Sequence, residues 1–235
     1  MHSQLISPLV LTVLVCASTV QRGGETLPAS DQRLVAAKDL NTPRAFPKIE
    51  SKTEWEARAK ETRGHSVILF DAFLTGAQAN AQPAPARKRL DLFFSAYNRT
   101  DLQERVQDCI TACAFAQAHS KSRRVVLCGS GRAGLWALLA APAADAVVAD
   151  CDSLDLTNDE LLLRPDLFVP GLRKIGAFDG AAALAAPHPL LLHNAGGNFP
   201  TGLLHAAYAA AKAEKAFRAE PARLPDQAIA DWLER

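Results

Sequence analysis

The sequence predicts an α/β domain, a three-layer sandwich in which helices cover a mostly parallel sheet. Three observations predict it. Short apolar runs typical of strands buried on both faces recur along the chain, such as "VVLC" at 125–128 and "LLLH" at 190–193. Segments with helical periodicity alternate with these runs, as in βαβ units. One strand-to-helix connection is a tight glycine turn, "GSGRAG" at 129–134.

Size and charge fit one such domain and exclude some partners. The chain has 235 residues, of which 49% are hydrophobic, which is enough for a sizeable core. The 26 Lys and Arg nearly balance the 25 Asp and Glu. This balance argues against a nucleic-acid partner, which would favour a basic excess. None of the five cysteines has CxxC spacing or a histidine at ligand spacing, so we expect no metal site and buried thiols, a disulfide among Cys109, Cys113, Cys128 and Cys151 being the alternative in an exported chain. We expect no cofactor.

The N-terminal segment has two interpretations. An apolar run from Leu5 to Ala17 has the length of a secretory signal and is too short to span a membrane. Val15 and Ala17 suit cleavage after Ala17, which predicts a signal peptide over 1–17 and a secreted or periplasmic protein. No Lys or Arg precedes the run, however. The alternative is a buried strand, "LVLTVLV", at the start of the domain.

The remaining elements follow in order. Residues 18–62 form a polar, proline-punctuated leader that ends in a short helix capped by Ser51, and 63–235 form the α/β domain. Thr100, with Gln103 three residues later, caps an amphipathic helix. Strands are expected within 65–73, 123–128, 145–152 and 188–197, and further helices within 135–142, 181–187, 201–217 and 224–235.

The glycine turn is consistent with a dinucleotide-binding fold. Gly129, Gly131 and Gly134 match G-x-G-x-x-G between a strand and a helix. Asp150 ends the next strand, where an acid that binds the ribose of NAD(P) or FAD would stand. Any tight strand-to-helix crossing also needs glycines, so the pattern has limited specificity. This interpretation predicts an oxidoreductase.

More of the chain supports a second interpretation. The stretches "VILFDAFLTG", "YNRTDLQERVQDCITACAFA", "GSGRAGLWALLAA" and "PLLLHNAGG", in this order, resemble the second half of the α/β-hydrolase fold. They look most like the bacterial dienelactone-hydrolase and acetyl-xylan-esterase-like group, and the leader resembles that of its exported members. The resemblance implies carboxylic-ester hydrolysis, with an acylated carbohydrate or a small ester as partner.

The catalytic positions of that family are not matched. Its nucleophile elbow is G-x-S-x-G. Aligned on this pattern, Gly129 is the first glycine, Ser130 the variable residue, Gly131 the nucleophile's position and Ala133 the second glycine. The position implied for the triad acid falls near Gly196 and Gly197.

The positions implied for the histidine and the oxyanion hole are also unfilled, because no histidine follows His205 and few residues separate the leader from "VILFDAF". The resemblance therefore indicates an internally deleted, non-catalytic member, a pseudoenzyme.

Two residues would have to carry any remaining activity, Ser130 and His193. Asp71, Asp150, Asn194 and Gly197 follow or end strands and are expected at the rim of the site, where ligands of α/β sheets bind. The sequence thus leaves three hypotheses: a degenerate hydrolase, an esterase that uses Ser130 and His193, and a dinucleotide-binding oxidoreductase.

Overall fold

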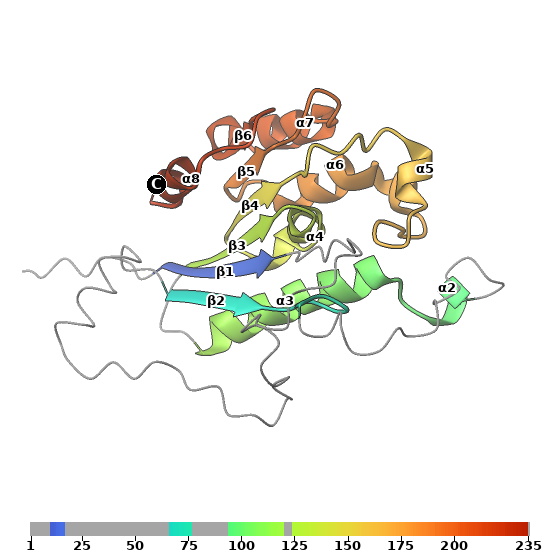
Figure 1. Ribbon diagram of the computed structural model, residues 1–235. Coiled ribbons are helices and arrows are strands. Elements are labelled where there is room, and N and C mark those ends of the chain that lie inside the picture. Colours follow the sequence, from blue (N-terminus) through green and yellow to red (C-terminus); the bar gives the residue numbers. More distant parts are fainter. Residues whose placement is uncertain (1–9, 17–65, 77–93, 120–123, 235) are drawn as a thin grey trace, which may run out of the picture. The chain divides into compact units, whose positions relative to one another are not determined.

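Six parallel strands form one sheet in the part of the chain that the structure describes. The computed structural model describes residues 10–16, 66–76, 94–119 and 124–234 (Figure 1). The strand order is β2-β1-β3-β4-β5-β6, and every neighbouring pair is parallel. The strands are β1 (Val10–Cys16), β2 (Ser66–Phe70), β3 (Arg124–Ser130), β4 (Ala146–Asp150), β5 (Leu190–His193) and β6 (Phe217–Ala219). The predicted mostly parallel α/β sheet is confirmed.

Helices pack on both faces of this sheet. Buried side chains of α3, α4, α6 and α7 share one core with Val125, Leu127, Val147 and Leu192. On the other face Trp232 and Leu233 of α8 pack against Val126, Cys128, Val148 and Leu191. The helices are α2 (Phe94–Tyr97), α3 (Asp101–His119), α4 (Ala133–Leu139), α5 (Asp159–Leu162), α6 (Ala177–Ala182), α7 (Gly202–Ala210) and α8 (Asp226–Leu233). Short 3₁₀ helices cover Ala141–Ala143, Leu172–Ile175, Ala183–Ala185 and Glu214–Ala216.

The start of α3 has the predicted cap. The Thr100 backbone N–H donates to Gln103 Oε1 at 2.8 Å, and the Gln103 N–H donates to Thr100 Oγ1 at 3.3 Å. This reciprocal pair satisfies two backbone donors that the helix itself cannot. It fixes the point at which the chain enters α3.

The structure uses part of the N-terminal apolar run as a strand. β1 pairs with β2 from Leu11↔Ser66 to Val15↔Phe70 and with β3 from Val10↔Arg124 to Cys16↔Ser130. This is the alternative that the sequence left open beside a signal peptide. The sheet therefore includes residues before 63, where the α/β domain was predicted to begin. The leader helix near Ser51 lies outside the described residues.

Three expected elements differ in detail. The helix expected over 201–217 is α7 followed by β6, because the chain reverses at Lys212, which has a φ of +54°. The helix expected over 181–187 begins earlier, at Ala177. β2 lies at the sheet edge rather than buried on both faces, and its Val67 and Leu69 are 50% and 67% exposed.

The described cysteines are small core residues, as the sequence predicts. Cys109, Cys113, Cys128 and Cys151 are buried and free. Burial raises the pKa of Cys128 and, with Asp150 nearby, that of Cys151, each to about 12. These thiols therefore stay protonated and poorly nucleophilic at neutral pH. Among the described helices, none is both long enough and apolar enough to cross a membrane.

Candidate functional site

Three neighbouring strands end in polar residues on the face that α8 covers. Side chains two apart on a strand share a face. Ser130 therefore follows Cys128 on β3, Asp150 follows Val148 on β4, and His193 follows Leu191 on β5. The ladder places Asp150 directly beside His193. Each strand thus changes from apolar to polar at its carboxyl end, where α/β sheets bind ligands.

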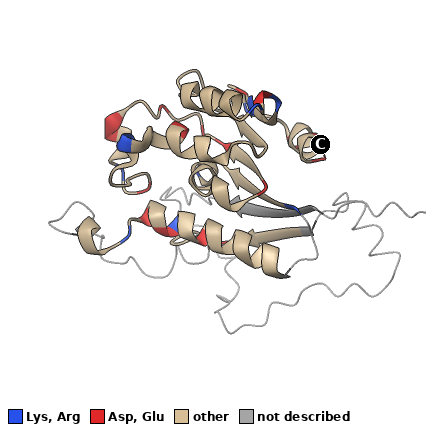
Figure 2. Cartoon of the chain, turned by 180° about the vertical axis from the view of Figure 1, so that it is seen from behind, with Lys and Arg blue, Asp and Glu red and all other residues tan. Residues whose placement is uncertain are grey.

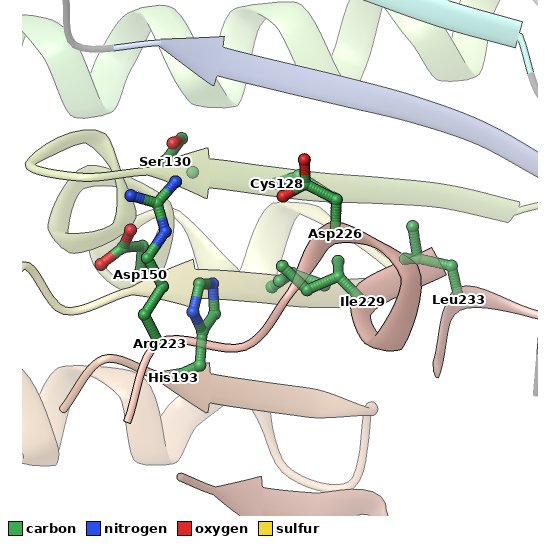
Figure 3. A pocket seen from close by; sticks show the side chains of 10 residues that line it. Cys128, Ser130, Asp150, His193, Arg223, Asp226, Ile229 and Leu233 are labelled. Atoms are coloured by element: carbon green, nitrogen blue, oxygen red, sulfur yellow. The ribbon is translucent and has the colours of Figure 1, made fainter. Parts of the chain in front are cut away.

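A pocket of about 370 Å³ lies between these strand ends and α8 (Figure 3). Its apolar walls are formed by Cys128 and Val148 of the sheet and by Ile229 and Leu233 of the helical side, and its other lining residues are Gly129, Ser130, Asp150, His193, Arg223 and Asp226. One end of the pocket is therefore apolar, and the other carries hydrogen-bonding and charged groups.

Beside the pocket, Gly131 forms the turn between β3 and α4. Its φ is +56°, which L side chains rarely adopt, and a Cβ built on it would meet no atom within 4 Å. At Gly134 the available space, not the backbone angle, requires a glycine. A Cβ there would lie 1.9 Å from the Asp150 carbonyl oxygen, because α4 packs directly on the backbone of β4. The two glycines thus serve turn geometry and close helix–strand packing.

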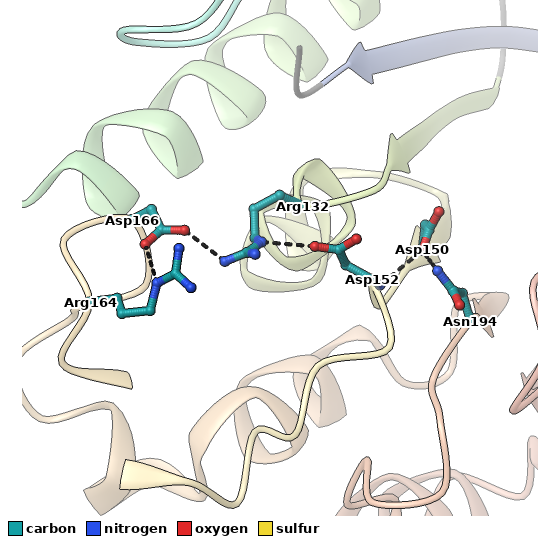
Figure 4. Close-up of polar contacts among 6 residues, drawn as sticks. All are labelled: Arg132, Asp150, Asp152, Arg164, Asp166 and Asn194. Carbon is teal, nitrogen blue, oxygen red and sulfur yellow. Dashed lines mark hydrogen bonds and ion pairs between the residues drawn. The ribbon is translucent and has the colours of Figure 1, made fainter. Parts of the chain in front are cut away.

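Asp150 is held by the loops that follow β4 and β5. Its Oδ1 accepts from Asn194 Nδ2 at 2.7 Å and from the Asp152 backbone N–H at 2.9 Å (Figure 4). Asn194 also contacts the Ser153 hydroxyl through its side-chain oxygen. The Asp150 residue is only 2% exposed. Its carboxylate is therefore used to join two loops.

His193 is a buried, neutral histidine. Burial is the main cause that lowers its pKa below the ordinary value of about 6.5. Asp150 and Asp226 act in the opposite direction, and Arg223 lowers the pKa further. The Leu224 backbone N–H donates to Nδ1 at 3.4 Å. Since Nδ1 accepts, the proton of the neutral ring is on Nε2, which makes Nε2 a hydrogen-bond donor.

The loop after β6 brings Arg223 to the pocket. Backbone hydrogen bonds from Asn194, Ala195 and Gly196 to the carbonyls of 222, 220 and 221 tie this loop to the one after β5. The Arg223 side chain extends over the pocket toward Ser130 and Asp150 (Figure 3). No ion pair joins it to a carboxylate of the described residues.

A second set of charges joins the glycine turn to two further loops. Arg132 donates from Nε to Asp152 at 3.0 Å and from Nη1 to Asp166 at 2.6 Å (Figure 4). Arg164 also pairs with Asp166, at 3.3 Å. These residues fix the loops after β3, β4 and α5 against one another.

The structure brings together only some of the predicted site residues. Ser130, Asp150 and His193 line one pocket, and Asn194 binds Asp150. Gly197 follows β5 but is not among the residues lining the pocket. Asp71 follows β2, which β1 and β3 separate from β4, so that it lies about 14 Å of sheet width away.

Arg223, Asp226 and Arg132 were missed by sequence reasoning. Arg223 and Asp226 follow a three-residue strand, β6, whose first residue, Phe217, is the last residue of an expected helix. Arg132 lies inside the glycine pattern, where only the glycines were weighed. The sequence feature that does indicate the site is a polar residue at the end of each apolar run, and this feature identified Asp150 and His193.

The described part of the site shows neither a serine–histidine hydrogen bond nor a metal-binding cluster. Within the described ranges, no hydrogen bond joins Ser130 Oγ to a histidine, and the Nε2–H of His193 cannot accept a proton from it. No group of three His, Cys, Asp or Glu residues in the described part could hold a metal ion.

Figure 2 shows acidic and basic residues interspersed along α3 rather than a single basic face.

Comparisons with known proteins identify the fold. No protein-family model matches the chain, and no curated protein matches it in sequence. A crystal structure from Bacteroides fragilis, assigned as an acetyl xylan esterase, superposes with a TM-score of 0.52 at 14% identity, over 94% of this chain and 60% of that one. A glucuronoyl esterase of carbohydrate esterase family 15 from Caldicellulosiruptor kristjansonii gives 0.49 at 13% identity, over 76% and 60%. The chain thus spans about 60% of each of these proteins. At 14% identity, the likeness to the Bacteroides fragilis structure establishes the α/β-hydrolase fold alone.

Proposed function

We propose that this chain, which has the α/β-hydrolase fold, comes from a lineage of carboxylic-ester hydrolases and no longer cleaves esters at the turn after β3. The observation that carries the proposal is Gly131. It occupies the turn between β3 and α4 with a φ of +56°, where the G-x-S-x-G pattern places the nucleophile. A glycine has no side chain that could attack an ester.

The other two triad positions support the same conclusion. The loop after β5 carries Asn194, Gly196 and Gly197, none of which is a carboxylate. The loop after β6, where the family pattern implies a histidine, presents Arg223 to the pocket. A guanidinium stays protonated at neutral pH and cannot serve as a general base. Loss of single triad members already lowers the rate by several orders of magnitude.

An esterase that uses Ser130 and His193 is the second candidate, because both line the same pocket. It requires Ser130 Oγ to pass its proton to a histidine nitrogen that is free to accept it. Nδ1 of His193 already accepts from Leu224, and Nε2 carries the ring proton. An esterase of this kind would therefore need the His193 ring in another orientation, with a nitrogen free to accept the proton of Ser130.

The dinucleotide alternative needs Asp150 to bind a ribose. Its carboxylate is instead buried and accepts from Asn194 and Asp152. We therefore disfavour NAD(P) and FAD as ligands. An acylated carbohydrate or a small ester stays the proposed partner, on the resemblance of the chain to esterases of that kind.

The deciding experiment is hydrolysis of a chromogenic acetate ester by the purified chain. We expect no turnover above background for the chain, for Ser130→Ala and for Ser95→Ala, an exposed control on α2. Turnover that disappears in Ser130→Ala and persists in Ser95→Ala would establish the second candidate. Equal turnover in all three would trace the activity to another residue or to a contaminant.

A further inference from the structure

The pocket between the strand ends and α8 is lined by a buried carboxylate that is only half satisfied. Asp150 is 2% exposed, and its Oδ1 accepts from Asn194 Nδ2 and from the Asp152 N–H. Its other oxygen, Oδ2, accepts no hydrogen bond from the described residues. Because buried polar atoms in folded proteins are normally paired, this oxygen indicates a donor that comes from a bound molecule.

Three charged side chains line this pocket, two carboxylates and one guanidinium. Asp226 is the first residue of α8, and Arg223 lies in the loop before it. Figure 3 shows that Arg223 extends toward Ser130 and Asp150, whereas Asp226 extends from α8 over β3. No ion pair joins Arg223 to either carboxylate in the described part of the chain. The pocket therefore presents a positive and a negative group at separate points.

The remaining lining residues and the volume set the rest of the ligand. His193 adds no charge at neutral pH, because burial lowers its pKa. A pocket of about 370 Å³ corresponds to about a dozen water-sized groups of about 30 Å³ each, which is room for a compound of about nine non-hydrogen atoms and a few waters. The apolar part of the wall, against which a hydrocarbon group would pack, consists of Cys128, Val148, Ile229 and Leu233.

Together these groups match a zwitterion that carries an apolar side chain. A guanidinium binds a carboxylate through two parallel N–H donors. An ammonium group has three N–H donors and no acceptor, so it suits a site with two carboxylates. A ligand with a cation alone would leave Arg223 unpaired beside it, and a ligand with an anion alone would approach two carboxylates. Both arrangements cost affinity, whereas a zwitterion pairs every charge.

We propose that this pocket binds a free α-amino acid with an apolar side chain, such as leucine. Its carboxylate accepts from Arg223 and from the hydroxyl of Ser130, which makes no other hydrogen bond to the described residues. Its ammonium group donates to Asp150 Oδ2 and to Asp226, and its side chain packs against the apolar wall. The inference goes beyond the proposed function, since this ligand has no ester bond, although it lies against the same turn after β3.

The test is calorimetric titration of the full chain at neutral pH with leucine and with compounds that each lack one of its groups. Isocaproate lacks the ammonium group, isopentylammonium lacks the carboxylate, glycine lacks the side chain, and N-acetylleucinamide lacks both charges. We expect leucine to bind with a Kd of about 1 mM or below, as the small number of its atoms allows. Each of the other compounds should bind at least about tenfold more weakly.

Two charge-removing variants assign the partners. Arg223→Met should weaken leucine binding about tenfold or more and remove the preference for leucine over isopentylammonium. Asp226→Asn should weaken leucine binding and reduce the preference for leucine over isocaproate. Arg173→Met and Asp231→Asn are the matched controls, because they make the same substitutions outside the pocket and should leave leucine binding unchanged.

Two further variants locate the side chain of the ligand. Ile229→Trp fills the apolar part of the pocket and should abolish leucine binding. Ile175→Trp adds the same ring at a position that is 58% exposed and should leave binding unchanged. Thermal unfolding shows which variants are folded. Arg223 and Asp226 are both exposed, so their variants test the site even if Ile229→Trp does not fold.

Several results would overturn the proposal. Isocaproate or isopentylammonium binding as tightly as leucine would mean that only one of the two charges is recognised, and N-acetylleucinamide doing so would mean that neither is. Absence of leucine binding, or full binding by Arg223→Met or by a folded Ile229→Trp, would reject the site. Ester turnover by a chain that binds leucine would refute only the proposed loss of catalysis, and absence of both would refute only this inference.

Discussion

Single residues around the glycine turn decide what it can do. Gly131 and Gly134 are three positions apart in one motif, yet they meet different constraints. At Gly131 the space is open and only the backbone angle is restrictive, while at Gly134 a side chain has no room. The G-x-G-x-x-G spacing that suggests a dinucleotide site is explained by these local demands. Sequence alone shows that both are glycines, but not which constraint each one satisfies.

Alanine substitutions should separate these constraints. Gly134→Ala forces α4 away from the Asp150 backbone and should lower the free energy of unfolding by about 3 kcal/mol or more. Gly131→Ala meets only the cost of a left-handed conformation, about 1–2 kcal/mol. Urea denaturation measures both values, and an equal loss for the two variants would contradict the packing described for Gly134.

His193 should make stability depend on pH. Its pKa is lowered in the folded state, so below about pH 6.5 the unfolded chain binds a proton that the folded chain does not. The stability associated with neutral His193 is present above that pH and is lost as the pH falls toward the folded-state pKa, by at most about 1.4 kcal/mol per pH unit.

His193→Gln keeps an acceptor for the Leu224 N–H and removes this titration. The difference between the urea midpoints at pH 7.5 and pH 5.5 should therefore be smaller in the variant than in the original chain. Asp179 should affect stability in the opposite direction to His193. Burial raises the pKa of its carboxyl, so its contribution to the free energy of unfolding falls as the pH rises. An unchanged difference would show that His193 titrates alike in the folded and unfolded states.

At the scale of elements, loops that follow different strands are joined by charge. Arg132 connects the turn after β3 to Asp152 after β4 and to Asp166 after α5. It is only 18% exposed, unlike the pair of Arg173 and Asp159 on the surface. The strands and long helices were predictable from periodicity. These connections were not, because they depend on which loops the strand order brings together.

Arg132→Met should lower the free energy of unfolding by about 1–2 kcal/mol, since two partly buried carboxylates lose their shared cation. Arg173→Met is the matched control and should cost at most about 0.5 kcal/mol, as is usual for exposed pairs. A double-mutant cycle with Asp166→Asn would show coupling only if the contact contributes. Equal effects of the two methionine variants would mean that the Arg132 contacts add little.

At the scale of the whole molecule, the sheet depends on the segment whose interpretation was divided. β1 has partners on both sides, β2 and β3. A short apolar run of this length fits a signal peptide as well as a central strand, and composition cannot distinguish them. The pairing partners decide between them, and these lie far along the chain. For the same reason β6 was not predicted: it is only three residues long, and only its pairing with β5 identifies it as a strand.

The two interpretations make opposite predictions for a chain that begins at Ser18. If β1 is part of the fold, this chain lacks a strand between β2 and β3 and should not unfold cooperatively on heating. In the full chain the amides of Val10–Cys16 should then be protected from hydrogen exchange. A Ser18 chain that melts like the full chain, or an exported protein with Ser18 as its first residue, would instead support the signal peptide.

The position of β1 also bears on how the protein is made. The strand leaves the ribosome before either of its neighbours exists. At about 5–20 residues per second, translation of the roughly one hundred residues before β3 takes on the order of ten seconds. Until β3 is made, at least one edge of this apolar strand has no partner in the nascent chain, and both edges lack one until β2 is made. The sheet can therefore close only late in synthesis, and β1 is the segment that a ribosome-associated chaperone would be needed to shield.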